Sequence, residues 1–545
     1  MSGFASSVLL GDLNDFIAPS QSCVNPIFAK PAKDGAAGEE LGMPKIGLAI
    51  ENDMDVGMSV EAFQAPPDLI KTSEQKTAKV SLSDCLACSG CVTSAETVLI
   101  EQQSRSEFER VAASGENDLV IVTLSTQSRA SLAVHFKMEV PDLTSRLEAV
   151  LKSKGVDFVL DASVAGDIAL LETANEFLFR YKNDSKENKL WETPTYSASV
   201  NSKSMELNPN KPNMSLVQHD GKVERKAKMP MLSSACPGWI CFAEKSNPEV
   251  LPYISTVKSP QQIAGSLVKW YVSKLTGVPV NRIYHTTIMP CADKKLEASR
   301  RDFLDAETGT NDVDCVLTTI EACEMVEDYV ADGDSEMMDT LQRNVKIPHQ
   351  LEALNRVSME GSQVIGASPS GGGSGGYLDF VYRVAARELF NISVPDGSLD
   401  WKVGRNADIH TVDLVVGDKT VLKFAAAYGF RNIQQIVRQI KRGKCPYDFV
   451  EIMACPGGCL NGGGQIRAEQ PGVKQSNALL GKKRLEELEV VFRQRRVRYP
   501  QDNSVVHHLY REWINGDPYS DVARSILHTH LHAVPKLENG LLQKW

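Results

Sequence analysis

Residues 452–465 read Ile-Met-Ala-Cys-Pro-Gly-Gly-Cys-Leu-Asn-Gly-Gly-Gly-Gln, which places Cys455 and Cys459 four positions apart in a loop of glycines. The apolar run from Tyr447 to Ala454 leads into this loop and predicts a buried strand. Glycine lets a backbone turn tightly around a bulky group and direct N–H groups inward. Thiolates in such a loop suit a soft, anionic cofactor, so the stretch predicts an iron–sulfur cluster, with zinc as the alternative.

The same pattern, an apolar run that ends at a cysteine beside proline, occurs at two other places. Residues 229–235 lead into Cys236, and residues 282–289 lead into Pro290 and Cys291. In open α/β sheets, ligands bind at the carboxyl ends of strands, so these three strand ends can meet at one site. The sequence therefore predicts a 4Fe–4S cluster held by four thiolates: Cys236, Cys291, Cys455 and Cys459.

Alternating strand and helix patterns follow from residue 118. Residues 119–124 and 157–160 are typical of strands, and residues 141–154 and 165–181 are typical of helices. This order predicts an α/β fold with parallel sheets, here two lobes with a cluster between them. Residues 182–228 interrupt the pattern and are expected to form a surface insertion.

A second cysteine group lies near the N-terminus. Cys85, Cys88 and Cys91 have the spacing C-x-x-C-x-x-C, which can cap three corners of a 4Fe–4S cube. The fourth ligand must come from elsewhere, and Cys23 is the nearest candidate because no other cysteine precedes residue 236. A zinc knuckle or unliganded thiols are the alternatives. Residues 29–78 are polar and are expected to form a long, partly disordered loop.

The composition narrows the classes of function. The chain has 545 residues, which suggests two or more domains or one large two-lobed body. Its net charge is −10, so no direct nucleic-acid partner is expected. It has no run of eighteen apolar residues and no secretory signal, so we expect no membrane span and a cytosolic or nuclear location. In such a reducing compartment its twelve cysteines are expected to be ligands or buried thiols.

Other motifs support fewer conclusions. Lys294 and Lys295 follow Cys291, and a lysine there would stabilise an anionic cluster. Residues 370–376 form a glycine-rich loop that opens a helix at 377–390, but the loop lacks the Lys-Ser/Thr of a phosphate-binding loop. It is expected to let the backbone pass close to the cluster pocket or a strand. The segment from His528 to His532 follows a helix at 521–527 and is expected to end a surface helix.

The remaining cysteines have no ligand-like spacing. They are expected to be buried as small hydrophobic side chains: Cys241, Cys315, Cys323 and Cys445.

Together these motifs resemble the iron-only hydrogenases over residues 80–535. The resemblance rests on five segments in order: Cys236-Pro237-Gly238-Trp239, Lys258-Ser259-Pro260-Gln261-Gln262, Met289-Pro290-Cys291 with Lys294-Lys295-x-Glu297-Ala298, Met453-Ala454-Cys455-Pro456-Gly457-Gly458-Cys459, and Leu527-His528-Thr529-His530 of the small-subunit type. Within that superfamily the chain is similar to the eukaryotic cytosolic branch, the nuclear prelamin A recognition factor-like proteins that act in iron–sulfur assembly. The run 12–17 before the lone Cys23, the glycine-rich loop at 371–376 and the terminal Trp545 carry this second resemblance.

The resemblance implies a role in the cytosolic assembly of iron–sulfur proteins, with two 4Fe–4S clusters. It implies two partners: an upstream cluster scaffold, and a targeting complex that includes a WD-repeat protein. The chain would dock on this complex through its own Trp545. It also implies an N-terminal cluster segment at 1–117, a hydrogenase-like body at 118–500 and a small-subunit-like region with a docking tail at 501–545.

One departure from the hydrogenases bears on activity. Hydrogenases carry a proton-transferring cysteine immediately before the Cys-Pro-Gly cysteine, whereas this chain has Ala235. Alanine has no ionisable group, so we expect no hydrogen chemistry. A hydrogenase-like redox enzyme and a protein that binds prelamin precursors are the alternative functions.

Overall fold

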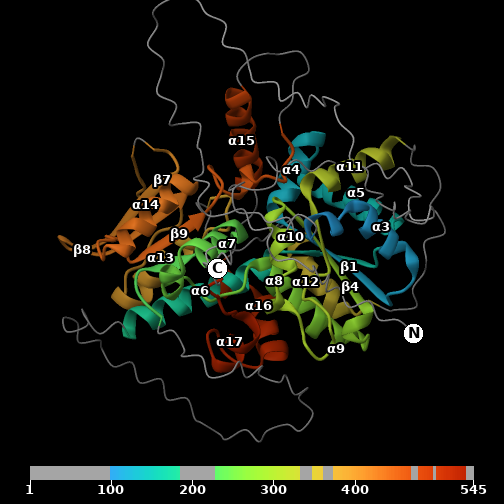
Figure 1. The fold of residues 1–545 in the computed structure, drawn as a ribbon, viewed down its shortest axis with the longest axis horizontal. Helices are drawn as coiled ribbons and strands as arrows, with labels where there is room; N and C mark the ends of the chain where they lie inside the picture. Colours follow the sequence, from blue (N-terminus) through green and yellow to red (C-terminus); the bar gives the residue numbers. More distant parts are fainter. Residues whose placement is uncertain are drawn as a thin grey trace, which may run out of the picture. The chain divides into compact units, whose positions relative to one another are not determined.

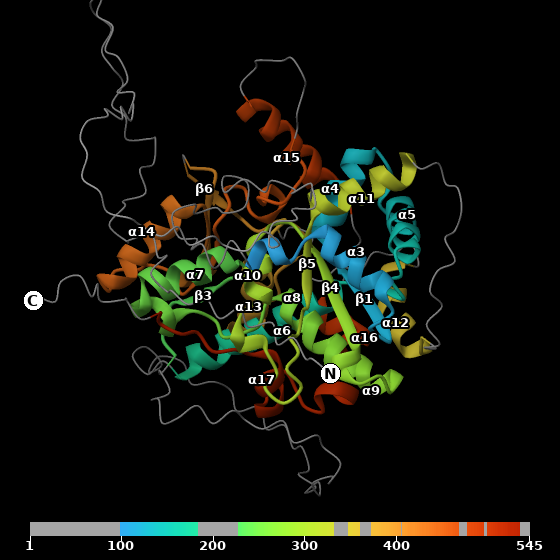
Figure 2. The same cartoon turned by 45° about the vertical axis from the view of Figure 1, so that its right-hand side comes forward.

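The computed structural model describes residues 99–183, 227–331, 347–359, 372–404, 406–467, 477–494 and 499–534. In these residues two β-sheets are covered by helices, and Figure 1 and Figure 2 show the sheets well apart from each other. The predictions for Cys23, Cys85, Cys88, Cys91, Trp545 and most of the 182–228 insertion lie outside the described residues.

The first sheet, sheet A, is entirely parallel. Its strand order is β2-β1-β4-β5. The strands are β1 (Leu119–Leu124), β2 (Phe158–Asp161), β4 (Ile283–Met289) and β5 (Cys315–Thr318). All six residues of β1 are buried because its two faces contact different cores. Leu119 and Ile121 belong to one hydrophobic cluster, and Val120 and Val122 belong to the other. A strand covered on both faces requires a continuous apolar run, and the sequence shows one.

The second sheet, sheet B, is mixed. Its order is β3-β9-β8-β7-β6. The strands are β3 (Met231–Ser233), β6 (Lys402–Val403), β7 (Ile409–Val416), β8 (Lys419–Tyr428) and β9 (Phe449–Met453). The strands β3, β9 and β8 are parallel, whereas β8, β7 and β6 pair antiparallel. The fold is therefore α/β with parallel sheets, as predicted, and sheet B carries an additional antiparallel edge.

The helices that the structure describes differ widely in length. The α-helices are α3 (Arg105–Ser114), α4 (Thr126–Phe136), α5 (Val140–Ser153), α6 (Ser163–Asn183), α7 (Pro237–Ser246), α8 (Pro260–Ser266), α9 (Ser273–Thr276), α10 (Asp293–Ala298), α11 (Thr319–Ala331), α12 (His349–Met359), α13 (Tyr377–Phe390), α14 (Phe430–Lys441), α15 (Asn477–Arg493), α16 (Ser504–Leu509) and α17 (Asp521–Leu527). Short 3-10 helices are η2 (Pro248–Tyr253), η4 (Val280–Arg282), η5 (Arg301–Phe303), η6 (Cys459–Asn461) and η7 (Pro500–Asp502), and π-helical segments are η3 (Leu267–Val272) and η8 (Tyr510–Ile514).

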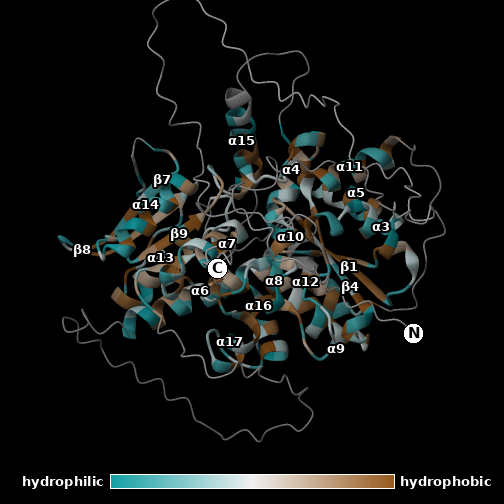
Figure 3. Cartoon of the chain, in the orientation of Figure 1, coloured by the Kyte–Doolittle hydropathy of each residue, from teal (hydrophilic) through white to brown (hydrophobic). Residues whose placement is uncertain are grey.

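One hydrophobic cluster joins the two sheets. It contains Ile121 of β1, Phe424 of β8 and Phe449 of β9. Phe177 of α6 packs between the elements, with its ring centroid 5.7 Å from those of Phe424 and Phe449. A second cluster, on the other face of sheet A, includes Phe108 of α3. Figure 3 shows this hydrophobic character along β1, β4 and β9. In the described ranges, no helix is both long and apolar enough to cross a membrane.

The C-terminal elements are fixed to α6 by a buried carboxylate. Glu172 is fully buried and accepts hydrogen bonds from the Tyr510 hydroxyl at 2.5 Å and the Tyr519 N–H at 3.0 Å. The His528 Nε2 lies 3.0 Å from Glu172 Oε2, the oxygen that also accepts the Tyr519 N–H. We call these four residues the Glu172 network. It connects α6 to η8 and to the segment on either side of α17.

Several predicted elements have the bounds that the sequence suggested. The strand at 119–124 and the helices at 377–390 and 521–527 coincide with β1, α13 and α17. The expectation that His528 to His532 end a surface helix is wrong, because α17 stops at Leu527 and His528 is extended. His528 is instead buried against Glu172, and His532 lies 2.8 Å from Asp302.

Candidate iron–sulfur centre

Four cysteines line one pocket between the two sheets. Cys236 follows β3, Cys291 follows β4, and Cys455 and Cys459 follow β9. The pocket has a cavity volume of about 30 Å³ and is lined by Ala235, Cys236, Pro237, Pro290, Cys291, Asp293, Lys294, Met453, Ala454, Cys455, Cys459 and Gly462. The predicted meeting of three strand ends is thus present. The strands belong to two different sheets, with β4 in sheet A and β3 and β9 in sheet B.

Serine hydroxyls fix the backbone at two of the cysteines. Ser234 Oγ donates to the Ile452 carbonyl at 2.6 Å and accepts the Cys236 N–H at 3.1 Å, which ties the end of β3 to β9. Ser374 Oγ accepts the Cys459 N–H at 3.0 Å. Neither serine was predicted as part of the site. Ser234 precedes Cys236 by two residues, and Ser374 lies in the glycine-rich loop, whose close approach to the cluster pocket was predicted.

The glycines allow the loops to approach closely. Gly457 and Gly458 have φ values of 70° and 79°, in the left-handed region that glycine adopts without strain. A Cβ atom at Gly462 would lie 2.3 Å from the Pro290 carbonyl oxygen. The glycine loop therefore packs directly against the turn that carries Cys291.

Cys236 is buried, and the other three pocket cysteines are partly buried. Burial raises the pKa of Cys236 to about 12, and the nearby Asp293 and Cys459 act in the same direction. Burial also raises the pKa of Cys291 and Cys455 well above their usual values. Four thiols close to one another become thiolates when a cationic centre binds them. The donor set and its burial fit a four-thiolate iron–sulfur cluster.

The two lysines after Cys291 have different positions. Lys294 lines the pocket, and its Nζ donates to Ser259 Oγ at 2.9 Å and to Glu297 Oε2 at 2.8 Å. The Lys294 charge acts to lower the pKa of the Cys459 thiol, although burial raises that pKa. Lys295 points elsewhere, because its Nζ donates to the Gln103 carbonyl at 2.7 Å. Only Lys294 of this pair is placed to act on the pocket.

The backbone also reaches one sulfur directly. The Ala454 N–H donates to Cys236 Sγ at 3.4 Å. Such N–H···S bonds stabilise the anionic form of a sulfur and tune the potential of a bound cluster.

A second, larger pocket adjoins the first. It has a cavity volume of about 100 Å³ and shares Ala235, Pro290, Lys294 and Cys459 with the cysteine pocket. Hydroxyl and amide side chains supply much of its remaining lining: Ser125, Thr126, Gln127, Ser163, Gln261, Ser374 and Tyr377. Ala235 therefore stands where the two pockets meet, and its methyl group offers no proton to either.

The other described cysteines lie away from the pocket. Cys315 and Cys323 are buried, as predicted, whereas Cys241 and Cys445 are only partly buried. None of the four is among the residues that line the cysteine pocket.

Comparison with known proteins identifies the family. The C-terminal domain family of the iron-only hydrogenase large subunit matches residues 118–210 and 213–463, and the iron hydrogenase small subunit family matches residues 480–534. The FeFe-hydrogenase of Chlamydomonas reinhardtii has the same fold, with a TM-score of 0.56 and 22% identity over 79% of this chain and 99% of that one.

The full-length relatives have more specific names. The rat protein "Cytosolic iron-sulfur assembly component 3" is 42% identical over 100% of both chains. The Dictyostelium discoideum protein "Probable cytosolic Fe-S cluster assembly factor narfl" is 40% identical over 99% of this chain and 98% of its own length. Family and fold together imply bound iron–sulfur clusters. The chain therefore belongs to the iron-only hydrogenase family, and within it to the branch whose curated members are named cytosolic iron–sulfur assembly factors.

Proposed function

We propose that this chain is a component of the cytosolic machinery for iron–sulfur protein assembly. In this role it acts as a carrier or adaptor between the scaffold that builds clusters and the complex that inserts them into cytosolic and nuclear proteins. The observation that carries the proposal is the convergence of four cysteines on one pocket, in a chain whose full-length relatives are named as assembly factors.

The four pocket cysteines would hold one 4Fe–4S cluster. Their number equals the number of irons in the cube, and a bound cluster would supply an electron-accepting, iron-linked bridge between the sheets. The chain's own groups would orient it: the Ala454 N–H meets Cys236 Sγ, and Lys294 places a positive charge beside Cys459. Asp293 near Cys236 opposes additional negative charge.

We further propose that Cys23, Cys85, Cys88 and Cys91 hold a second 4Fe–4S cluster in an N-terminal segment at 1–117. The support is their spacing, since three cysteines at C-x-x-C-x-x-C can cap three corners of a cube. The hydrogenase-like body would then span residues 118–500. The small-subunit-like region and docking tail would span residues 501–545.

The proposed role does not include hydrogen turnover. Ala235 lies at the junction of both pockets, where hydrogenases have a proton-transferring cysteine. A methyl group neither accepts nor donates a proton, so general acid–base catalysis has no group at this position. Gas-phase measurement of hydrogen from fully iron-loaded, chemically reduced protein should give no signal above a cluster-free control. Reproducible hydrogen evolution would instead support a hydrogenase-like enzyme.

The partners follow from the same role. We propose a cytoplasmic location, with access to the nucleus, and docking on a targeting complex with a WD-repeat subunit through Trp545. A pull-down with the complete chain and with a variant lacking Trp545 tests this docking. Loss of the targeting complex with retention of the upstream scaffold supports the assignment, and unchanged capture of every partner contradicts it.

The decisive experiment is replacement of the native protein in cells. Wild-type chain should restore the activity of a cytosolic iron–sulfur enzyme, and Cys455→Ser should fail to restore it, because one pocket ligand is missing. Cys445→Ser, in the loop before β9 and outside the pocket, is the matched control and should restore activity fully. If Cys455→Ser restored the enzyme activity, the proposal that the pocket cluster is required would be wrong.

A further inference from the structure

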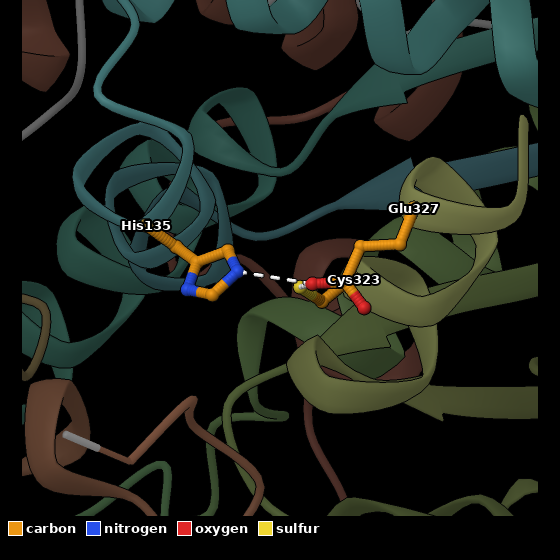
Figure 4. Close-up of side chains that lie close together, drawn as sticks. All are labelled: His135, Cys323 and Glu327. Carbon is orange, nitrogen blue, oxygen red and sulfur yellow. Dashed lines mark hydrogen bonds and ion pairs between the residues drawn. The ribbon is translucent and has the colours of Figure 1, made fainter. Parts of the chain in front are cut away.

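A second group of metal-binding side chains lies away from the cysteine pocket, on two helices that cover sheet A. His135 is in the last turn of α4, and Cys323 and Glu327 are on α11. The ligand atoms of these three residues all lie within 4.8 Å of one another, and Figure 4 shows the side chains meeting between the two helices. We propose that His135, Cys323 and Glu327 form a site for a single zinc-type divalent ion, with water as the fourth ligand.

The helices hold the donors in a suitable arrangement. Cys323 and Glu327 are four residues apart on α11, so their side chains share one face of that helix. His135 reaches this face from α4, and its Nε2 lies 3.1 Å from Glu327 Oε1. Cys323 Sγ lies 3.5 Å from the same oxygen.

These separations are close to those of a zinc tetrahedron. Zinc–sulfur bonds of about 2.3 Å and zinc–nitrogen or zinc–oxygen bonds of about 2.0–2.2 Å give donor–donor edges of about 3.4–3.6 Å. The Cys323–Glu327 edge already has this length, and the His135–Glu327 edge needs only to lengthen slightly. The remaining edge, from His135 to Cys323, is at most 4.8 Å long.

Charge and exposure also suit a dication. Glu324 and Glu327 place negative charge beside Cys323, and Arg484 is the nearby cation that opposes binding. When the ion binds, the Cys323 thiol proton goes to solvent, and the His135 ring proton moves to Nδ1 so that the Nε2 lone pair faces the ion. No electron is transferred. The side chains of His135 and Glu327 are 34% and 53% exposed, which leaves a direction open for water.

An ion at this place would connect two helices that begin beside the adjoining pocket and the cysteine loop. Thr126 and Gln127 of α4 line the adjoining pocket. At the start of α11, Thr319 Oγ1 donates to Ser128 Oγ at 2.8 Å, and the Ile320 N–H donates to the Gly464 carbonyl at 3.2 Å. The ion would therefore fix the outer parts of helices whose inner ends support the cysteine loop.

The test uses the full chain with its iron–sulfur sites already loaded, so that the cluster cysteines are occupied. The protein is mixed with one equivalent of Zn²⁺, desalted, and analysed for zinc, for iron, and by X-ray absorption at the zinc edge. We expect about one zinc per chain, with one sulfur at about 2.3 Å and nitrogen or oxygen at about 2.0 Å. Iron content should not change.

Three variants should each weaken zinc binding at least tenfold in competition with a chromophoric chelator: His135→Gln, Cys323→Ser and Glu327→Gln. The first and third change exposed side chains, so they keep the test valid if the buried Cys323→Ser fails to fold. Cys445→Ser is the control and should bind like the wild type. Failure to retain zinc, a zinc ion surrounded by four sulfurs, or unchanged binding by His135→Gln and Glu327→Gln would each overturn the proposal.

Discussion

Gly462 brings the cysteine loop against the turn that carries Cys291. A Cβ atom there would lie 2.3 Å from the Pro290 carbonyl oxygen and 3.1 Å from the Cys459 carbonyl oxygen. Because both neighbours are backbone atoms, relief requires movement of a loop and not of a side chain. At this position the absence of a side chain sets the distance between two of the cysteine-bearing strand ends.

We predict that Gly462→Ala lowers the iron retained by the reconstituted protein and destabilises the fold by roughly 1–3 kcal/mol, because overpacking shifts backbone. Iron analysis after desalting and a thermal melt measure both effects. Gly481→Ala is the matched control, since a Cβ atom there meets nothing within 4 Å and the residue lies in α15. Full iron retention and an unchanged melt for Gly462→Ala would show that the close approach has no consequence.

His285 gives the stability a defined pH dependence. It is fully buried on β4, with Nε2 2.8 Å from Thr123 Oγ1 and Nδ1 3.0 Å from the Asp312 carbonyl oxygen. Burial lowers its pKa from 6.5 to about 3. The unfolded chain therefore binds more protons than the folded one between these two values. The His285 contribution is complete above pH 6.5 and is lost progressively as the pH falls towards 3.

The expected cost of this imidazole at pH 5, relative to pH 7, is about 2 kcal/mol of the free energy of unfolding. His285→Gln should remove that part of the acid sensitivity, whatever its effect at pH 7. Denaturant unfolding of both proteins at pH 7 and pH 5 measures the difference. A His285→Gln variant with the wild-type loss between pH 7 and pH 5 would disprove the assignment.

At the scale of elements, the Glu172 network holds the C-terminal elements on α6. Glu172→Gln removes the charge that the Tyr510 hydroxyl, the Tyr519 N–H and His528 all contact. We predict a destabilisation of about 2–4 kcal/mol, because hydrogen bonds to a buried charge are the strong ones. Faster proteolysis after residue 499, followed by mass spectrometry, would show that the loss is local to this segment.

The control for that experiment is Glu512→Gln. Glu512 pairs with Arg511 at 2.9 Å on the exposed surface of the same region, so its loss should change little. Equal proteolysis of the two variants would mean that the buried network does not fix the segment.

Strands were predicted correctly from the sequence where burial of the strand produced a run of apolar residues. The strands β1, β4 and β9 are almost entirely buried and consist mostly of apolar residues, so their runs are visible in the sequence. The antiparallel β7 and β8 were not predicted. Most residues of β7 are only partly buried, and β8 begins with the exposed Lys419 and Thr420, so the apolar signal of these strands is weak.

At the scale of the whole molecule, the two proposed clusters should differ in what they contribute to the fold. Cys236 and Cys291 reach the pocket from different sheets, so Cys236→Ser should remove about half of the iron and also lower the melting temperature. Cys85→Ser should remove about half of the iron and leave the melting temperature unchanged. Iron analysis, electron paramagnetic resonance and thermal melts of both variants measure this. Equal, mild iron loss with identical melting temperatures would contradict the prediction that the two clusters contribute differently to the stability of the fold.

The part of the candidate site that could be predicted from the sequence is the set of cysteines at strand ends. Cys236, Cys291 and Cys455 each follow an apolar run directly, so chain pattern and sheet geometry placed them together. Ser374 contacts Cys459 from a separate loop, and His135 meets Glu327 across 192 residues of chain. Contacts of this kind depend on how helices pack over a sheet, which local periodicity does not encode.

The origin of the pocket ligands in two sheets has a consequence for the lifetime of the protein. A chain that lost the proposed cluster to oxygen would lose the iron-mediated connection between β4 and β3–β9, and the four pocket thiols would be left without a metal. Proteolytic quality control acts on open forms in proportion to their population. The abundance of this protein should therefore follow the iron and oxygen supply of the cell, so that a shortage of cofactor is registered as faster turnover of the chain itself.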